Sequence, residues 1–308
     1  MKAVVVGLGT QGKKRKKILK SKKSFVTDVD PFSKEAKFNF LEEVDLNTYD
    51  TCFLCVPDEE KIRLIKYCIK NNKHILVEKP LSVKKVEIIK KISNEAKSRK
   101  IVIYTAYNHR FEPHFKKMRS LIEKKKLGKI YSCRIFYGNG TARLVKKSSW
   151  RDKGSGVLHD LAPHLLDTCK LWFGKKVKKF KIISVHRFEN KSPDHVIIQS
   201  VNSKIFIELE MTLCMWKNYF SCDIIGEKGS AHIENLCKWG PSKFIHRKRI
   251  LPSGKPYEKK ITLKRKDPTW EEEHRFFQKL INDKKNFSLN KDFWILDNIH
   301  SLEKKINV

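Results

Sequence analysis

Three ionisable residues stand where their side chains could move a proton together: Lys79, Asp160 and His164. Lys79 lies in V-E-K-P-L directly after an apolar run, and the other two are four residues apart in G-S-G-V-L-H-D-L-A-P-H-L-L-D. A spacing of four puts a carboxylate and an imidazole on one face of a helix. Histidine titrates near neutral pH and a carboxylate orients it, so this pair suits proton transfer to or from a hydroxyl group.

Each of these residues also has a purely structural interpretation. Pro163 is tolerated only in the first turn of a helix, so we expect Asp160 at the N-terminal edge and His164 just inside. Asp160 would then serve equally as a helix cap beside a half-buried histidine. Lys79 stands at the carboxyl end of a predicted parallel strand, where ligands bind, but with 67 basic residues an ordinary surface lysine fits as well.

A glycine-rich turn, G-L-G-T-Q-G, follows the first apolar run and contains Gly7, Gly9 and Gly12. Between a strand and a helix, such glycines allow a tight turn, close approach of a pyrophosphate and helix–strand packing. We therefore predict that these glycines, with Thr10 and Gln11, bind a dinucleotide. A glycine turn of some other α/β protein is the alternative.

An acidic residue at the end of the second strand strengthens the dinucleotide interpretation, because its carboxylate can accept hydrogen bonds from the adenosine ribose. Asp28 is the first choice and Asp30 the second, in V-T-D-V-D-P. The spacing from Gly12 to Asp28 is short, so we expect a turn to end the first helix early. A carboxylate here repels a 2′-phosphate, which favours NAD, although neighbouring lysines leave NADP possible.

The elements that must position these residues form two groups. Up to about residue 110, strands alternate with helical patterns, which predicts a doubly wound parallel sheet. Beyond it, one more helix and a series of alternating strands joined by short turns predict an α+β domain with an open, mostly antiparallel sheet covered by helices on one face. The predicted domains are 1–110 and 111–308, with a last helix that packs back on the first domain. The expected strands of the first domain are 2–7, 24–30, 51–57, 74–80 and 100–108; the expected helices include 11–22, 59–72, 115–126, 270–283 and 293–306.

Composition excludes several classes of protein. No run approaches the roughly 18 to 20 apolar residues of a membrane span, and the first residues lack a secretory pattern, so we expect a cytoplasmic protein without a membrane partner. The net charge of +33 is spread over every segment, and the densest run, residues 13–23, is interpreted as a solvated helix face, without a specific nucleic-acid partner. Cys52 and Cys55 form a C-x-x-C inside a predicted buried strand, without a second metal-spaced pair, so no metal site is predicted.

Taken together, the motifs resemble the glucose-fructose oxidoreductase, inositol dehydrogenase and rhizopine-catabolism (Gfo/Idh/MocA) family. The resemblance covers nearly the whole chain: G-L-G-T-Q-G, C-V-P-D-E-E, H-I-L-V-E-K-P-L-S, Y-N-H-R-F-E-P, the G-x-G-V-L-x-D-L-x-x-H-L-x-D segment and I-I-G-E-K-G-S. It implies a Rossmann domain followed by an α/β domain built on an open antiparallel sheet.

This resemblance also implies roles for individual residues. His164 would take or donate the hydroxyl proton, assisted by Lys79 and Asp160, while hydride passes between a substrate carbon and the nicotinamide. Pro57 and Glu78 would line the cofactor. Asn108 and Arg110 would lie near the nicotinamide and the substrate; further substrate contacts are expected from Arg143, Trp150, Arg151 and His159. Two departures, Lys61 where many members carry histidine and His159 where an apolar residue is common, put substrate contacts in doubt.

The predicted function is therefore an NAD(P)-dependent dehydrogenase that acts on a sugar, cyclitol or nucleotide-sugar. Arginines at 143 and 151 would suit a phosphate or carboxylate on that substrate. Two alternatives stay open: an NAD-dependent glycosidase that works by oxidation, elimination and reduction, and a non-catalytic dinucleotide-sensing regulator. Relatives commonly assemble through the open sheet face, so the resemblance implies a homo-dimer or homo-tetramer.

Overall fold

A computed structural model describes residues 1–83, 85–148, 151–283 and 289–306. The chain separates into two compact units, which we call the first and second unit. The first comprises Met1–Tyr107 and Glu271–Leu296, and the second comprises Asn108–Trp270 and Asp297–Val308. The sequence predicted a boundary at residue 110, with the last helix packing back on the first domain; by contacts, residues 271–296, which include most of α7 and the start of α8, group with the first unit.

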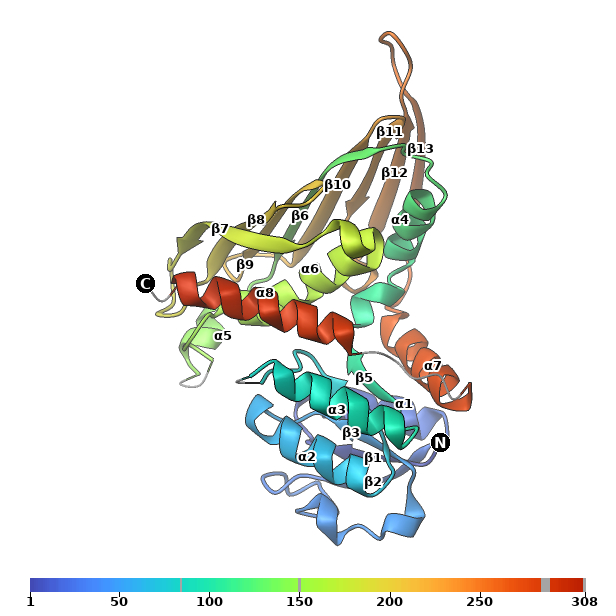
Figure 1. The fold of residues 1–308 in the computed structure, drawn as a ribbon, viewed down its shortest axis with the longest axis vertical. Helices are drawn as coiled ribbons and strands as arrows, with labels where there is room; N and C mark the ends of the chain where they lie inside the picture. The colour runs from blue at the N-terminus through green and yellow to red at the C-terminus, as the bar shows by residue number, and fades with distance from the viewer. Residues whose placement is uncertain (84, 149–150, 284–288, 307–308) are drawn as a thin grey trace. The chain divides into compact units, whose positions relative to one another are not determined.

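The first unit contains a five-stranded, entirely parallel sheet in the order β2-β1-β3-β4-β5 (Figure 1). Its strands are short apolar runs buried on both faces, as expected when helices cover a parallel sheet. The chain moves outward from β1 to β2 and then returns to the other side at β3, which creates a topological switch point at the carboxyl ends of β1 and β3. The predicted doubly wound fold is confirmed. The elements are β1 (Ala3–Val6), α1 (Thr10–Ser21), β2 (Phe25–Val29), β3 (Thr51–Leu54), α2 (Asp58–Lys70), β4 (His74–Glu78), α3 (Glu87–Ser98), β5 (Ile103–Ala106) and α7 (Thr269–Asn282), followed by the first part of α8 (Asn290–Ile306).

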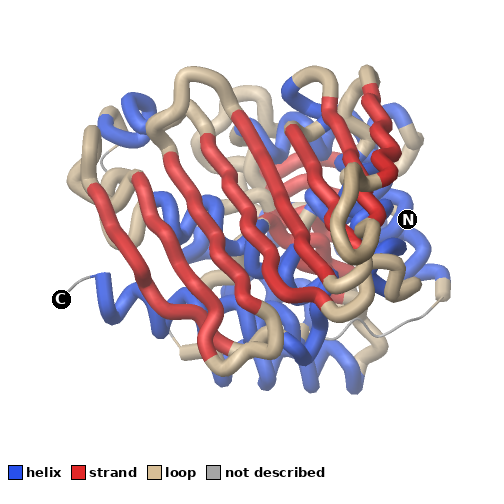
Figure 2. Tube along the Cα trace, turned by 90° about the horizontal axis from the view of Figure 1, so that it is seen from above, coloured by secondary structure: helices blue, strands red, loops and turns tan. Residues whose placement is uncertain are grey.

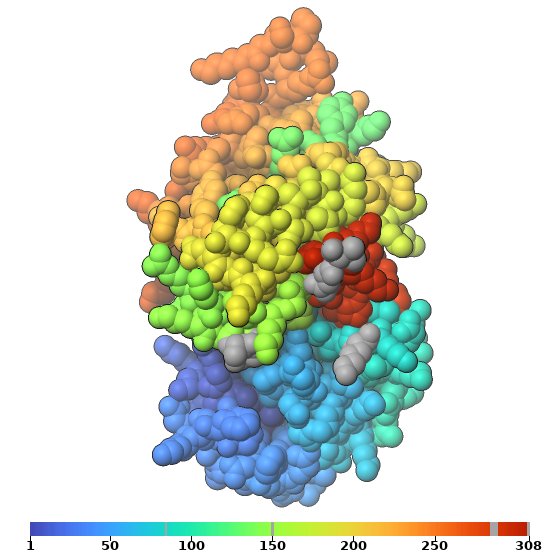
Figure 3. Space-filling view, turned by 90° about the vertical axis from the view of Figure 1, so that its left-hand side faces the viewer, coloured from blue at the N-terminus to red at the C-terminus, as the bar shows by residue number. Residues whose placement is uncertain are grey.

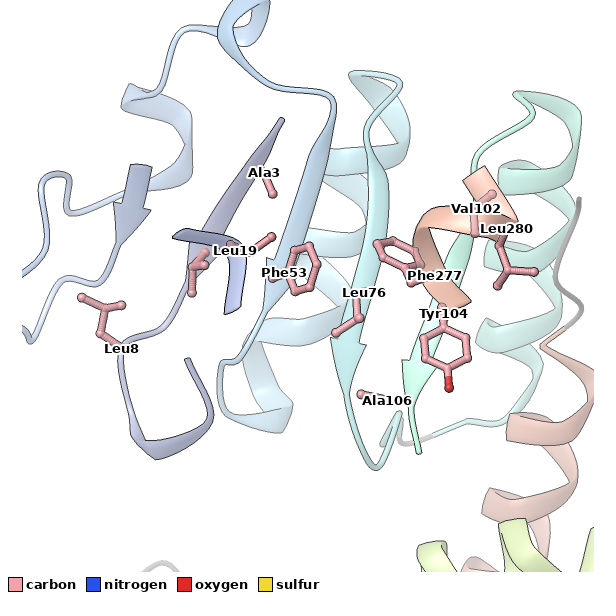
Figure 4. Close-up of a cluster of buried hydrophobic side chains, with 11 residues drawn as sticks. Ala3, Leu8, Leu19, Phe53, Leu76, Val102, Tyr104, Ala106, Phe277 and Leu280 are labelled. Atoms are coloured by element: carbon pink, nitrogen blue, oxygen red, sulfur yellow. The ribbon is translucent and has the colours of Figure 1, made fainter. Parts of the chain in front are cut away.

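Helix α7 completes the core of the first unit although it comes from the far end of the chain. Phe277 contacts Phe53 edge-on, with ring centroids 5.7 Å apart, and lies 6.1 Å from the ring of Tyr104. Figure 4 shows Phe277 and Leu280 against the sheet. Burying one such side chain stabilises a fold by about 1.5–3 kcal/mol, so the first unit depends on this late helix.

One basic residue of the lysine-rich run is not on a solvated face. Arg15 is 1% exposed. Its Nε donates to Glu78 at 2.9 Å, and its Nη2 donates to Glu273 at 2.6 Å. The lysines of α1 are largely exposed, as predicted, but the prediction is wrong for Arg15, because two buried carboxylates compensate its charge.

The second unit is built on an eight-stranded sheet in the order β13-β12-β11-β10-β6-β9-β8-β7 (Figure 2). All neighbouring strands are antiparallel except β6 and β9, and α4 and α6 pack on one face. The predicted open, mostly antiparallel sheet is confirmed. The elements are the 3₁₀ turn η3 (Asn108–Phe111), α4 (Pro113–Glu123), β6 (Ile130–Gly138), α5 (Ala142–Lys146), α6 (Val157–Phe173), β7 (Lys179–His186), β8 (His195–Val201), β9 (Phe206–Thr212), β10 (Tyr219–Gly226), β11 (Gly229–Glu234), the 3₁₀ turn η5 (Cys237–Trp239), β12 (Ser242–Lys248) and β13 (Tyr257–Leu263).

Helix α6 begins earlier than the sequence predicted. It starts at Val157, so Pro163 lies inside the helix and not in its first turn. Most of α6 is buried, and it contacts β8, β9 and α4, so packing outweighs the hydrogen bond that proline cannot donate. Asp160 consequently stands in the first turn, where the helix dipole favours a carboxylate, and His164 stands one turn further in.

No helix in the described part of the chain is both long and apolar enough to cross a membrane.

Replacing Glu273 with glutamine is expected to remove a pH dependence from the stability of the first unit. Burial raises the pKa of Glu273 from 4.5 to about 7, even though the Arg15 guanidinium opposes the shift. The folded state therefore holds this proton more tightly than the unfolded state. As pH rises from about 4.5 to about 7, the parent should lose on the order of 2 kcal/mol of stability relative to Glu273→Gln.

Chemical denaturation of both proteins across this pH range measures the difference. Glu271→Gln is the matched control, because Glu271 is an exposed carboxylate on the same helix. Parallel stability curves for parent and Glu273→Gln would show that Glu273 stays ionised in the folded state.

Candidate active site

The glycine turn of the first unit is shaped by direct contact with neighbouring backbone. Gly7 has a φ of +90°, and a Cβ added there would lie 2.4 Å from the carbonyl oxygen of Cys55. A Cβ on Gly12 would lie 1.8 Å from the carbonyl oxygen of Gly7, so α1 crosses the turn too closely for any side chain. A Cβ on Gly9 would meet nothing within 4 Å. Gly7 and Gly12 thus close the turn, while Gly9 leaves open space in front of it.

That open space lies at the N-terminus of α1. Gly9 is the N-cap residue, and the first turn of the helix carries no acidic side chain. Thr10 and Gln11 are exposed beside it. A helix N-terminus with a partial positive charge and room for an approaching anion fits the pyrophosphate of a dinucleotide.

The two candidate ribose-binding aspartates differ in their surroundings. Asp28 is 3% exposed, forms an ion pair with Lys16 and accepts a hydrogen bond from the Lys37 backbone at 3.0 Å. Asp30 follows the end of β2, is partly exposed, and accepts a hydrogen bond from the Leu8 backbone at 2.7 Å. Asp30 therefore adjoins the glycine turn and is partly exposed, although the Phe32 backbone also donates to it at 2.9 Å, whereas Asp28 is buried inside the unit. The position and exposure of Asp30 favour it over Asp28 as the candidate for a ribose contact.

Lys79 follows the last residue of β4 and is partly exposed. The preceding Glu78 is held by Arg15, and the carbonyl of the following Pro80 accepts a hydrogen bond from the Lys61 ammonium at 2.7 Å. The turn that carries Lys79 is therefore fixed on both sides by buried cations.

Lys61 is an unusual residue for the interior, at 2% exposed. Burial lowers its pKa, and the neighbouring Asp58, which accepts its hydrogen bond at 2.6 Å, opposes that shift. Both residues belong to the first turn of α2, which starts after the N-cap residue Pro57. Pro57 thus begins the helix that holds the Lys79 turn. The sequence identified Lys61 only as a departure from the family pattern.

In the second unit, α6 presents Asp160 and His164. Asp160 is partly exposed and lies 3.8 Å from the Arg151 guanidinium, and His159 beside it is also partly exposed. His164 is 9% exposed. The predicted pair therefore has one member near solvent and one largely enclosed.

His164 is packed against a second histidine that sequence reasoning did not single out. The ring of His109, from η3, stacks on it with centroids 4.0 Å apart and planes inclined by 17°. Tyr137 of β6 lies 5.5 Å from the His109 ring, and the Lys238 ammonium of η5 lies 3.3 Å from His109 Nε2. His109 is part of the Y-N-H-R-F-E-P motif, which was the available signal.

The other residues of that motif have well-defined partners in the second unit. Asn108, predicted to contact the cofactor, donates to the Thr269 hydroxyl at 3.0 Å. Arg110, predicted to contact substrate, forms a two-pronged ion pair with Asp167 of α6 at 2.6 and 2.7 Å. The Arg110–Asp167 pair ties η3 to α6 and so supports the stacking of the two histidines.

Of the remaining predicted substrate residues, Arg143 lies in α5 and Arg151 follows that helix in the chain. Arg143 is exposed and 3.5 Å from Glu189, and Trp150 falls outside the described residues. Nearby, residues 146, 148, 152, 153 and 187–191 line a depression of about 680 Å³, and the described parts of these segments are visible in green and yellow in Figure 3. Its lining carries four basic residues, Lys146, Lys153, Arg187 and Lys191, and two acidic ones, Asp152 and Glu189.

The C-x-x-C motif does not provide reactive sulfur. Burial raises the pKa values of both the Cys52 and Cys55 thiols well above their ordinary range, so both stay protonated at neutral pH. Within the described ranges, no three His, Cys, Asp or Glu side chains are arranged to hold a metal ion.

Comparison with protein families identifies both halves of the chain. Residues 1–107 match the oxidoreductase family with an NAD-binding Rossmann fold, and residues 115–232 match the GFO/IDH/MocA C-terminal domain.

Individual relatives share only about a quarter of their residues with this chain over the matched part. Myo-inositol 2-dehydrogenase from Thermotoga maritima is 26% identical over 132 residues, which is 42% of this chain and 38% of that protein. Bovine trans-1,2-dihydrobenzene-1,2-diol dehydrogenase is 27% identical over 199 residues, 60% of this chain and 56% of the relative. The match therefore covers only 38% and 56% of the length of these two curated relatives.

The fold as a whole resembles solved structures closely. Levoglucosan dehydrogenase, solved in complex with NADH, aligns with a TM-score of 0.84 at 17% identity and covers 99% of this chain and 97% of that one. Because the two family models match successive parts of the chain, with the glycine turn in one and the Asp160–His164 helix in the other, the chain belongs to the Gfo/Idh/MocA oxidoreductase family.

Proposed function

We propose that this protein is an NAD-dependent dehydrogenase that oxidises a hydroxyl group, or reduces the corresponding carbonyl, on a sugar or cyclitol. The observation that carries the proposal is the Asp160–His164 pair on α6, with its histidine largely enclosed. The open space at Gly9 supports a dinucleotide as the second reactant.

The first unit would hold the cofactor. The amides at the start of α1 would face the pyrophosphate, and Asp30 would accept hydrogen bonds from the adenosine ribose. A carboxylate at that place favours NAD over NADP, because it repels a 2′-phosphate. The carboxyl ends of the strands would receive the nicotinamide, so Glu78 and Pro57 stand where cofactor contacts are expected. NAD, when bound, supplies the hydride acceptor that no side chain provides.

The protein's own part in the chemistry would be proton transfer. A hydride leaves a carbon more readily as its hydroxyl proton departs, so a base must stand within hydrogen-bond reach of that oxygen. His164 would accept the proton, and Asp160 would stabilise the imidazolium that forms. Lys79 would stabilise negative charge on the substrate oxygen.

The relatives support the substrate class. Their names specify inositol, a dihydrodiol and levoglucosan, all of which are cyclic alcohols. The depression lined by Lys146, Lys153, Arg187 and Lys191 has two more basic than acidic side chains, which favours a substrate that also carries a phosphate or carboxylate.

Turnover with NAD is expected on a panel of sugars, inositols, sugar acids and sugar phosphates, measured as NADH absorbance. Lys79→Ala and His164→Ala should each lower kcat/KM by about 100-fold or more while NAD still binds. Lys66→Ala, at an exposed position on α2, is the control and should leave turnover unchanged.

The same assay separates the alternatives. Bound NAD with glycosidic cleavage but no net NADH would favour the glycosidase, and binding without any reaction would favour a regulator. Failure to bind either NAD or NADP would refute the proposal.

Asp30→Asn is expected to weaken NAD binding by about 10-fold, since a hydrogen bond to a charged group contributes about 1.5–3 kcal/mol. The binding of NADP should fall less or rise, because a repulsive charge is removed. Isothermal titration with both cofactors measures the ratio. Asp28→Asn should instead lower the melting temperature and leave the ratio unchanged, so the opposite pattern would return the ribose contact to Asp28.

Lys61→Met should loosen the turn that carries Lys79. It leaves the Pro80 carbonyl and the Asp58 carboxylate without their shared donor, at a cost of about 1–3 kcal/mol in unfolding free energy. We expect kcat to fall more than NAD affinity, because the turn positions the catalytic lysine. Lys66→Met, on the same helix, is the matched control, and equal effects of the two substitutions would show that Lys61 has no positioning role.

A further inference from the structure

His109 and His164 form a pair in which only one ring can readily carry a charge. Their centroids are 4.0 Å apart, and the two side chains are 2% and 9% exposed. Two imidazolium rings stacked at this distance, away from water, repel each other strongly. Protonation of one ring therefore suppresses protonation of the other, and the pair titrates as a unit.

Lys238 makes the two rings inequivalent. Its ammonium lies 3.3 Å from His109 Nε2. An ammonium group only donates hydrogen bonds, so Nε2 must be the accepting nitrogen and the His109 proton must stand on Nδ1. A proton added to Nε2 would displace this bond and face a positive charge.

The position of Lys238 is set by its neighbours in the second unit. Its ammonium lies 4.5 Å from the centroid of the Trp239 ring and 3.5 Å from the Tyr137 hydroxyl. The backbone N–H of the preceding Cys237 donates to Glu112 at 3.1 Å, which ties η5 to the residue that follows η3. Lys238 is thus held beside His109 by packing and by the chain itself.

The other charged groups around the two rings do not supply the same bias. On α6, Asp160 lies one turn before His164, and Asp167 is neutralised by Arg110. Burial raises the pKa of Glu112 to about 7, so its carboxylate is only partly charged near neutral pH. On α4, Lys116 lies over the Phe111 ring. Among the described contacts of His109, Lys238 is therefore the cation that donates a hydrogen bond to it.

We propose that Lys238 is a positioning residue for the proton: it keeps His109 neutral, so that His164 is the ring of the pair that accepts the substrate proton. A neutral His109 then offers its aromatic face to the His164 imidazolium as it forms. This inference deepens the proposed function and rests on it for its catalytic consequence, but the protonation pattern itself exists without cofactor or substrate.

Nitrogen NMR of histidine-labelled protein, without cofactor or substrate, tests the protonation pattern. Single variants, His109→Phe and His164→Gln, assign the two rings. In the parent, His109 should keep the spectrum of the neutral Nδ1–H tautomer between about pH 5.5 and 9 while His164 titrates. In Lys238→Met, His109 should also take up a proton, and the first protonation step of the pair should move up by about 0.5 to 1 pH unit.

Lys243→Met is the matched control, since Lys243 is a partly exposed lysine on β12 paired with Glu234, and it should leave both rings unchanged. Lys238→Arg should retain the parental pattern. A parental His109 that titrates within this range, or a Lys238→Met variant with unaltered titrations, would overturn the proposal, whether or not the protein is a dehydrogenase.

The catalytic consequence has a separate readout. For alcohol oxidation, His164 must be neutral, so activity is lost as pH falls through its titration. Lys238→Met should move the acid limb of kcat/KM upward by about 0.5 to 1 pH unit and change KM little. The double variant Lys238→Met/His109→Phe keeps an aromatic ring in the stack but removes the competing base, so it should restore the parental acid limb. A purely structural role for Lys238 predicts no such rescue.

Discussion

The pairing of Arg15 with Glu78 and Glu273 is the interaction on which most of the first unit depends. It joins α1, the end of β4 and α7, three elements that also carry the glycine turn, the Lys79 turn and the aromatic core (Figure 4). A buried guanidinium needs each of its acceptors, since removal of one leaves a buried donor without a partner, at a cost of about 1–3 kcal/mol. The same contacts that close the fold therefore set the geometry at the carboxyl edge of the sheet.

In the second unit, helix α6 has the corresponding role of joining distant parts of the chain. Most of α6 is buried, and the Arg110–Asp167 ion pair and the histidine stack connect it to η3. An internal proline removes one backbone hydrogen bond, and the surrounding packing compensates. The proposed base, His164, and its neighbour Asp160 thus lie on one helix whose position is fixed by contacts on several sides.

The sequence predicted what local patterns encode. β-Branched apolar runs marked the five parallel strands, and the spacing of Asp160 and His164 marked one helix face. The strand-like stretches recognised in the second domain ended at residue 235, so β12 and β13 were not predicted; β13 is largely exposed and reads Y-E-K-K-I-T-L without a buried face. Sequence patterns also missed pairings between distant residues. Arg15 and Glu273 are 258 positions apart, and Lys238 and His109 are 129 apart, so no spacing rule links them. The choice between Asp28 and Asp30 depends on where β2 ends. A sequence pattern locates such a strand end poorly.

Strand β13 has a consequence for how the molecule behaves in a concentrated solution. It forms one border of the eight-stranded sheet, and a bordering strand offers backbone groups to which a strand of another molecule could add. Lys259 and Lys260 are exposed residues of this strand, and Lys255 precedes it. Desolvating these charges opposes strand addition, so part of the large lysine excess acts as protection against aggregation through the sheet edge. Because salt screens this repulsion, the protection weakens as ionic strength rises.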